Sequence, residues 1–328
     1  MNVLLVGAGP MAVAYAKALR AQAVPFEAVG RGQRSAAAFA EAVGSRPIEG
    51  GLEVYLAKNT IEGARPVIVA LPIPQLATAA KQLVAGGARY ILVEKPAGLN
   101  LDEIASVEAV AAKSGARIFV AYNRRFYASV DAARRIIAED GGVSSFHLDF
   151  SEIADRIATP DKDPAVLANW LLANSSHMFD LVFHLAGEPK EMNGAVKGIL
   201  RWHPAGAVFT GHGRTVSGAL FTWHADWTSA GRWGLDLRTT RRRVLLQPVE
   251  TLLVQDKNSF SLQPVEIDDQ MDRAFKPGIY RQVQAFLSET KATSLLPTIF
   301  LHAATTRRWV SGLFGCETGS LLSVGRTS

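Results

Sequence analysis

The chain is poor in cysteine and in long apolar runs. Its 328 residues contain one cysteine, Cys316, which excludes an internal disulfide and fits a cytoplasmic location. Its apolar stretches are shorter than the roughly 20 residues that a membrane-spanning helix needs. The first residues lack a basic leader and a cleavage site, so Met1–Val6 is expected to form a strand rather than a signal peptide. We therefore expect no membrane partner.

Charge is limited as well. Charged residues make up 20% of the chain and hydrophobic residues 48%, which is typical of a globular protein, and the length suits two domains. The net charge of +5 raises the question of nucleic-acid binding. Because the basic residues are mostly dispersed, we expect attraction of anionic small molecules rather than nucleic acid. No metal site is expected.

The first 122 residues alternate apolar runs with amphipathic or alanine-rich stretches. Buried strands separated by helices are typical of a doubly wound parallel sheet, which predicts an α/β Rossmann domain over residues 1–122. The expected strands are Val3–Val6, Phe26–Val29, Val67–Leu71, Tyr90–Glu94 and Ile118–Tyr122. The expected helices are Pro10–Ala21, Ser35–Val43, Pro74–Ala85 and Leu101–Lys113.

Residues 123–328 have a different pattern, which predicts an α+β domain. Helices are expected first, and then a mainly antiparallel sheet, because apolar residues alternate from about residue 192 to 267. Ala219–Trp227 and Trp233–Leu237 are expected to pair as a hairpin. The large apolar side chains of Ala219–Trp227 also predict an interface, through which the chain forms a homodimer or homotetramer. The last helix is expected to pack back on the first domain.

A glycine motif follows the first strand directly. Gly7, Gly9 and Ala12 form G-x-G-x-x-A between a strand and a helix. Gly7 allows a tight turn, Gly9 lets the backbone approach a pyrophosphate, and the helix that starts at Pro10 and Met11 presents its positive end to the anion. The motif predicts binding of a dinucleotide.

An acidic residue is missing where the second strand ends. NAD-specific sites usually carry an Asp or Glu there, which binds the ribose 2′-hydroxyl. Here the segment Val29–Ser35 offers Arg31, Arg34 and Ser35 instead. Arginine suits a phosphate, so we expect NADP(H) to be preferred over NAD(H), although the same segment could be a solvated turn. Leu71 and Pro72 end the third strand, where they would border the cofactor or form a simple turn.

Four motifs resemble the Gfo/Idh/MocA family of nicotinamide-dependent sugar and polyol oxidoreductases. They are the glycine motif, Glu94-Lys95-Pro96, the run from Tyr122 to Phe126, and His177-Met178-Phe179-Asp180. The resemblance covers nearly the whole length and implies a Rossmann domain followed by a domain with a large open sheet, which often forms the oligomer interface. It also implies hydride transfer between a nicotinamide and a hydroxyl or ketone carbon of a sugar.

The resemblance implies roles for individual residues. Lys95 would touch nicotinamide and substrate, and His177 would face the substrate; both are the expected catalytic groups, because lysine and histidine can move the proton of a reacting hydroxyl. Glu94 and Asn123 are expected to contact the cofactor. The other expected substrate contacts are Tyr122, Arg124, Asn174, Asp180 and Tyr280. A hinge role for residues 123–125 and core packing of Tyr280 and Trp170 are the alternatives.

One position departs from the family pattern. The family places an Asp four residues before the histidine, and here that residue is Ala173. Either Lys95 and His177 suffice, or the chemistry differs. A non-catalytic NADP-binding regulator or scaffold is the alternative function.

Overall fold

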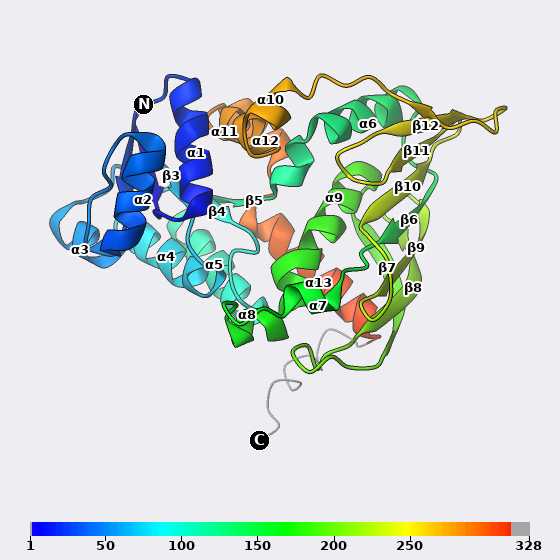
Figure 1. Cartoon of the computed structure of the whole chain (residues 1–328), viewed down its shortest axis with the longest axis horizontal. Coiled ribbons are helices and arrows are strands. Elements are labelled where there is room, and N and C mark those ends of the chain that lie inside the picture. Colours follow the sequence, from blue (N-terminus) through cyan, green and yellow to red (C-terminus); the bar gives the residue numbers. More distant parts are fainter. Residues whose placement is uncertain (1, 316–328) are drawn as a thin grey trace. The chain divides into compact units, whose positions relative to one another are not determined.

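The computed structural model describes residues 2–315, so Cys316 lies outside the described part. The chain forms two compact units. The first comprises the chain up to Phe126 together with Gln270–Ala303, and the second comprises Tyr127–Asp269 together with the chain from Ala304. Figure 1 labels most of the helices and strands of both.

The first unit is built on a parallel sheet of five strands in the order β2-β1-β3-β4-β5. This confirms the predicted doubly wound sheet. The strands are β1 Val3–Val6, β2 Phe26–Val29, β3 Pro66–Val69, β4 Tyr90–Glu94 and β5 Arg117–Ala121. The helices are α1 Pro10–Ala21, α2 Gln33–Val43, α3 Gly51–Lys58, α4 Ile73–Ala85, α5 Leu101–Ser114, α10 Gln270–Ala274, α11 Ile279–Phe286, α12 Glu289–Leu295 and the first residues of α13, Ile299–Phe314.

The strand order reverses between β1 and β3. β1 continues to β2 on one side, and the chain then crosses to β3 on the other. A parallel bridge between Val29 and Ile48 adds a further neighbour outside β2. In open α/β sheets, ligands bind beyond the carboxyl ends of the strands at such a reversal, so the loops after β1, β2 and β3 are the first place to search for a site.

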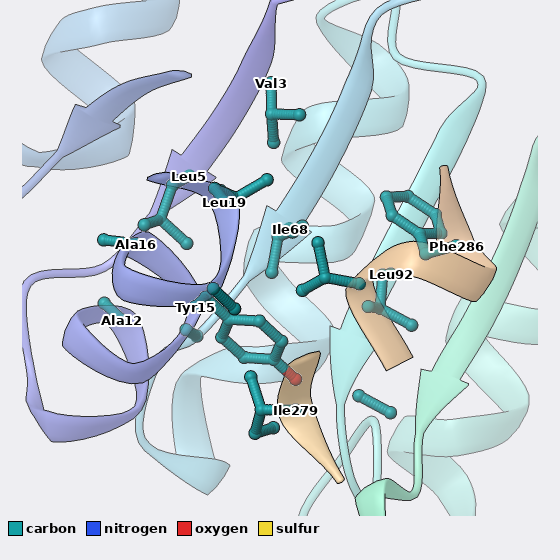
Figure 2. Close-up of a cluster of buried hydrophobic side chains, with 14 of the residues drawn as sticks. Val3, Leu5, Ala12, Tyr15, Ala16, Leu19, Ile68, Leu92, Ile279 and Phe286 are labelled. Atoms are coloured by element: carbon teal, nitrogen blue, oxygen red, sulfur yellow. The ribbon is translucent and has the colours of Figure 1, made fainter. Parts of the chain in front are cut away.

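Both faces of this sheet are covered by helices. α1 packs against α11 on one face, and α4 packs against α5 on the other (Figure 1). The core between α1, the strands and α11 includes Leu5, Ile68, Leu92 and Phe286, all fully buried (Figure 2). Helix coverage of both faces explains why the strands are continuous apolar runs.

The second unit combines helices with a sheet of eight strands. The helices are α6 Ala128–Glu139, α7 Ala154–Ile157, α8 Pro164–Ala168, a π-helical turn Leu171–Ser175, α9 Ser176–Ala186 and the rest of α13. The strands are β6 Ser145–Asp149, β7 Pro189–Lys197, β8 Val208–Thr215, β9 Leu220–Asp226, β10 Gly234–Arg238, β11 Arg242–Leu246, β12 Leu253–Asp256 and β13 Gln263–Pro264. The predicted second, mainly antiparallel sheet is confirmed.

The predicted hairpin within this sheet is wrong. The strand order is β13-β12-β11-β10-β6-β9-β8-β7, so β6 lies between β9 and β10. β6 pairs parallel to β9 and antiparallel to β10. The residues between β9 and β10 therefore cross over β6 instead of forming a tight turn. Period-two alternation fixes the face of each side chain but not the partner of the strand.

One face of the second sheet is apolar and buried within its own unit. Phe221, Trp223 and Trp227 are at most 4% exposed. Phe221 packs against Phe183 of α9 at 5.7 Å between ring centroids. The intervening residues of β9, among them Thr222 and His224, are exposed. The apolar residues that suggested an oligomer interface are therefore already covered by helices of the same chain.

The tryptophans are distributed unequally between the two units. All six, at positions 170, 202, 223, 227, 233 and 309, belong to the second unit.

The described residues 2–315 include no helix long and apolar enough to span a membrane. They also include no group of three or more His, Cys, Asp or Glu side chains that could hold a metal ion.

Candidate functional site

The glycine turn after β1 has the backbone that a pyrophosphate site needs. Gly7 has a φ of +133°, and a Cβ there would collide with the carbonyl oxygen of Ala70 at the end of β3. A Cβ at Gly9 would meet no described atom within 4 Å, which leaves the space before α1 open. Gly9 is the N-cap of α1 and Pro10 occupies its first turn, so within the described chain no side chain caps its first amides. The turn therefore fits an anion such as a dinucleotide phosphate.

The loop after β2 lies directly beside this turn. The amide of Gly7 donates to the carbonyl of Val29 at 2.8 Å. Gly30 is packed so closely that a Cβ there would lie 2.8 Å from the Cβ of Ala8. Arg31 and Arg34 follow and are exposed, while the Ser35 hydroxyl donates to Gly32 O at 2.9 Å. Two cations thus lie next to the glycine turn, where the adenosine ribose of a dinucleotide would be.

The Glu94-Lys95-Pro96 segment forms a turn at the same edge of the sheet. The amide of Ala97 donates to the carbonyl of Glu94 at 3.0 Å and closes the turn around Lys95. His302 of α13 approaches the carbonyl of Pro96 at 2.9 Å. Burial lowers the pKa of His302 to about 4, so the neutral ring donates its Nε2 hydrogen to this carbonyl. Lys95 is half-buried.

Tyr122 and Asn123 follow β5, the last strand along the chain in this sheet, and are both buried. The Asn123 side-chain amide donates to Pro277 O at 2.9 Å, and Arg125 donates to Leu295 O at 3.3 Å. These bonds attach the segment before α11 and the end of α12 to the sheet edge. Asn123 and Arg125 thus link these segments, which agrees with the hinge role considered for residues 123–125 as well as with a site role. Arg124 is half-buried beside them.

A carboxylate that the sequence analysis missed organises the candidate substrate residues of the second unit. Glu152 follows β6 and accepts three hydrogen bonds: from Trp170 Nε1 at 2.8 Å, from Asn174 Nδ2 at 2.9 Å and from Ser175 Oγ at 2.9 Å. Trp170 directly precedes the π-helical turn Leu171–Ser175, and the other two donors belong to it. Single π-turns inside helices frequently occur at functional sites.

His177 lies in the first turn of α9, directly after the π-helical turn. Its side chain is 6% exposed, and its ring lies 6.3 Å from that of Trp233. Asp180 is three residues further along the same helix and is half-buried. Ala173, where the family pattern has a carboxylate, is 2% exposed. Glu152 therefore brings a carboxylate from a different segment of the chain to this region, hydrogen-bonded to Trp170 before the π-helical turn and to Asn174 and Ser175 within it.

A cationic groove of about 550 Å³ borders α1 on the first unit. Its charged lining residues are Lys17, Arg20, Arg273 and Lys276, together with apolar residues of α1 and the end of α2. Pro10 is the one predicted cofactor residue that lines it.

The structure thus brings most predicted residues together in two separate groups. The first lies beyond the carboxyl ends of the parallel strands: Gly7, Gly9, Pro10, Met11, Arg31, Arg34, Ser35, Leu71, Pro72, Glu94, Lys95, Tyr122, Asn123 and Arg124. The second, in the other unit, comprises Asn174, His177 and Asp180. Tyr280 belongs to α11 of the first unit, where its ring lies 5.1 Å from that of Phe275.

The comparisons with known proteins agree with this geometry. Residues 1–122 match the model of the Gfo/Idh/MocA oxidoreductase family, described as having an NAD-binding Rossmann fold. A comparison with curated proteins gave no match.

Solved structures of oxidoreductases resemble the chain over most of its length. An NAD-binding oxidoreductase from Klebsiella pneumoniae is 18% identical, with a TM-score of 0.75 over 98% of this chain and 97% of that one. UDP-N-acetylglucosamine 3-dehydrogenase from Acidithiobacillus ferrooxidans is 14% identical, with 0.71 over 95% and 96%. Levoglucosan dehydrogenase with NADH and levoglucosan is 18% identical, with 0.72 over 95% and 96%.

At these identities the solved structures establish the fold alone. The family model adds a match over the first domain, whose parallel sheet agrees with the Rossmann fold that the model describes. Residues 1–122 thus fold as a Rossmann domain and match the model of the Gfo/Idh/MocA oxidoreductase family.

Proposed function

We propose that the chain is an NADP(H)-dependent oxidoreductase that transfers a hydride between the nicotinamide and a hydroxyl or ketone carbon of a sugar or sugar derivative. One observation carries the proposal: the Gly7–Met11 turn and the Glu94–Ala97 turn lie beyond the carboxyl ends of the same parallel sheet. The family of the first domain supports the redox class. The sugar dehydrogenases that share the fold support a sugar-like substrate.

Different residues bind the cofactor, transfer the proton and contact the substrate in this proposal. The Gly7–Met11 turn binds the pyrophosphate with backbone amides, and Leu71, Pro72, Glu94 and Asn123 border the cofactor. When bound, NADP(H) supplies or accepts the hydride. Lys95 and His177 hold the reacting oxygen and move its proton. Further substrate contacts come from Tyr122, Arg124, Asn174, Asp180 and Tyr280.

Replacement of the two proton-transfer residues tests the catalytic roles. Lys95→Ala and His177→Ala should each reduce turnover by roughly 10²–10⁴-fold, because general acid–base groups typically contribute that much. NADPH binding, measured by nicotinamide fluorescence, should remain because the phosphates are held at the other turn. His184→Ala, on the same helix as His177, is the control. Parent-like turnover by both variants on the true substrate would refute the assignment.

The preference for NADP rests on the loop after β2. The loop carries Arg31 and Arg34 with no acid between Val29 and Ser35. Arg31→Ala should weaken NADPH binding by about 1.5–3 kcal/mol, the value of a charged hydrogen bond, and barely affect NADH. Arg117→Ala removes an exposed arginine at the opposite end of β5, where it pairs with Glu289, and should change neither affinity. Tighter binding of NADH by the unaltered protein would contradict this preference.

A non-catalytic NADP-binding regulator or scaffold is the second candidate, favoured by Ala173 in place of the family carboxylate. Incubation with NADPH and a panel of ketosugars, followed by the absorbance of the reduced nicotinamide, separates the two. If NADPH binds but no ketosugar of the panel oxidises it, the result would support the regulator.

We also propose that the protein is cytoplasmic and forms a homodimer or homotetramer through the second sheet. The face that carries Thr222 and His224 is the one exposed in β9, so a partner would meet polar side chains. Light scattering that gives the mass of a monomer at micromolar concentration would contradict the assembly.

A further inference from the structure

A buried polar cluster lies directly beneath the Glu94-Lys95-Pro96 turn. The Tyr15 hydroxyl of α1 lies 2.6 Å from Glu94 Oε1 at the end of β4, and 3.0 Å from Gln282 Oε1 of α11. Tyr15 and Gln282 are fully buried, and Glu94 is 9% exposed. Figure 2 shows the Tyr15 ring within the core, with its oxygen directed toward the segment that carries Ile279. Three elements distant in sequence thus meet at the residue before Lys95.

The hydrogen-bond chemistry gives this cluster a direction. Tyr15 has one hydroxyl hydrogen, and the shorter contact assigns it to the Glu94 carboxylate. The Nε2 of Gln282 is buried and has no hydrogen-bond partner among residues 2–315. A half-turn of the Gln282 amide places Nε2 against the Tyr15 oxygen, where it donates. The cluster then forms a chain in which Gln282 donates to Tyr15 and Tyr15 donates to Glu94.

The surroundings of Glu94 decide its charge. Burial raises the pKa of Glu94 above its usual value, and it is opposed by the Tyr15 hydrogen bond, the Lys95 charge and backbone amide, and the Lys276 charge, in that order. His302, which contacts the other side of the turn, is kept neutral by burial. The Tyr15 hydrogen bond is therefore the largest of the effects that offset the rise of the Glu94 pKa caused by burial. Without this bond the carboxylate would take up a proton more readily.

We propose that Tyr15 and Gln282 are positioning residues for Lys95: their hydrogen bonds fix the Glu94 side chain beside it and favour the charged form of that carboxylate, which orders the lysine turn for proton transfer. The inference rests on the proposed function, because Lys95 is the proton-transfer group there. A purely structural contact among α1, β4 and α11 could be apolar, because an apolar contact avoids the desolvation that a buried carboxylate costs. The presence of the Glu94 carboxylate, with Tyr15 and Gln282 as a chain of hydrogen-bond donors toward it, favours an electrostatic role.

Tyr15→Phe is the main test, with Tyr90→Phe as its matched control. Both tyrosines belong to the first unit, both are at most 7% exposed, and both hydroxyls contact α11, since Tyr90 donates to Phe286 O at 2.6 Å. Only Tyr15 contacts Glu94. Tyr15→Phe should lower kcat by roughly 10- to 100-fold, the equivalent of one charged hydrogen bond. It should also move the acidic limb of the pH–rate profile to higher pH and leave the KM for NADPH unchanged.

Two further variants separate charge from packing. Glu94→Gln should reduce kcat at every pH and remove the Glu94 contribution to the acidic limb, since no carboxylate remains at position 94 to titrate. Gln282→Leu keeps a side chain of similar volume but removes the donor to Tyr15. It should therefore shift the acidic limb in the same direction as Tyr15→Phe.

A readout that does not need a substrate keeps the inference separate from the proposed function. The Glu94 carboxyl carbon can be followed by ¹³C NMR against pH, with Glu94→Gln to assign its signal, in the parent, Tyr15→Phe and Tyr90→Phe proteins. A higher titration midpoint in Tyr15→Phe alone supports the network even if no substrate is found. An unchanged midpoint, or a loss of kcat in Tyr15→Phe without movement of the acidic limb, overturns the inference. Failure of the parent protein to bind NADPH would overturn the proposed function instead.

Discussion

Glu152 offers the sharpest test of the second unit, because one substitution can remove its charge and keep its hydrogen bonds. The carboxylate accepts from Trp170 and Asn174 on Oε2 and from Ser175 on Oε1. A glutamine can accept the first two bonds at its oxygen and donate its amide hydrogen to the Ser175 hydroxyl. Glu152→Ala leaves all three donors without this acceptor.

The magnitude follows from the burial of the three donors. Ser175 is fully buried, so its unpaired hydroxyl costs about 1–3 kcal/mol, whereas Trp170 and Asn174 are half-buried and can reach water. We expect Glu152→Ala to lower the free energy of unfolding by about 3 kcal/mol and Glu152→Gln by about 1 kcal/mol or less. Urea unfolding followed by tryptophan fluorescence measures both, because every tryptophan belongs to this unit.

The same pair of variants also tests for a catalytic charge. If Glu152 only orders the π-helical turn before His177, Glu152→Gln keeps parent-like turnover and Glu152→Ala loses it. If the charge itself replaces the carboxylate missing at Ala173, Glu152→Gln loses turnover while it remains folded. Equal losses of stability in the two variants would refute the hydrogen-bond reasoning.

Two further predictions concern the first unit. Gly9→Ala should fold like the parent, because a Cβ there meets open space, but it should lose NADPH binding in a fluorescence titration. Gly7→Ala should instead lower the melting temperature. An unchanged NADPH affinity in Gly9→Ala would contradict the pyrophosphate site. The pKa of His302 is about 4 in the folded protein and 6.5 in the reference state, so unfolding takes up a proton and stability falls as the pH drops from about 6.5 to about 4. His302→Gln should flatten this decline by about 3 kcal/mol in urea unfolding at several pH values, followed by circular dichroism, and an unchanged slope would show that other groups cause it.

The sequence predicts the Rossmann strands well because most of their residues are buried. The bounds of β1, β2 and β4 match their apolar runs residue by residue. The hairpin expected from Ala219–Leu237 fails because alternation carries no information about the neighbouring strand, and the partner of β9 is the distant β6, where Ser145 pairs with Leu220.

The candidate site follows a similar division. Residues at strand ends, such as Gly7 and Lys95, can be found from the sequence because parallel strands bring their carboxyl ends to one edge. Glu152 and the Tyr15–Glu94–Gln282 cluster cannot, since their partners are separated by up to 267 residues and carry no local pattern. An isolated glutamate after a strand has no signal that distinguishes it from a solvated residue.

Because all tryptophans lie in the second unit, energy transfer from tryptophan to a bound reduced nicotinamide can measure a distance within the protein. Indole emission overlaps the absorption of reduced nicotinamide, so NADPH bound at the glycine turn would accept excitation energy from the tryptophans of the other unit. The efficiency of this transfer depends on the separation of donor and acceptor. Quenching of indole emission on addition of NADPH, compared with the same titration with NADP⁺, would therefore report in solution how close the two units come, without any attached dye.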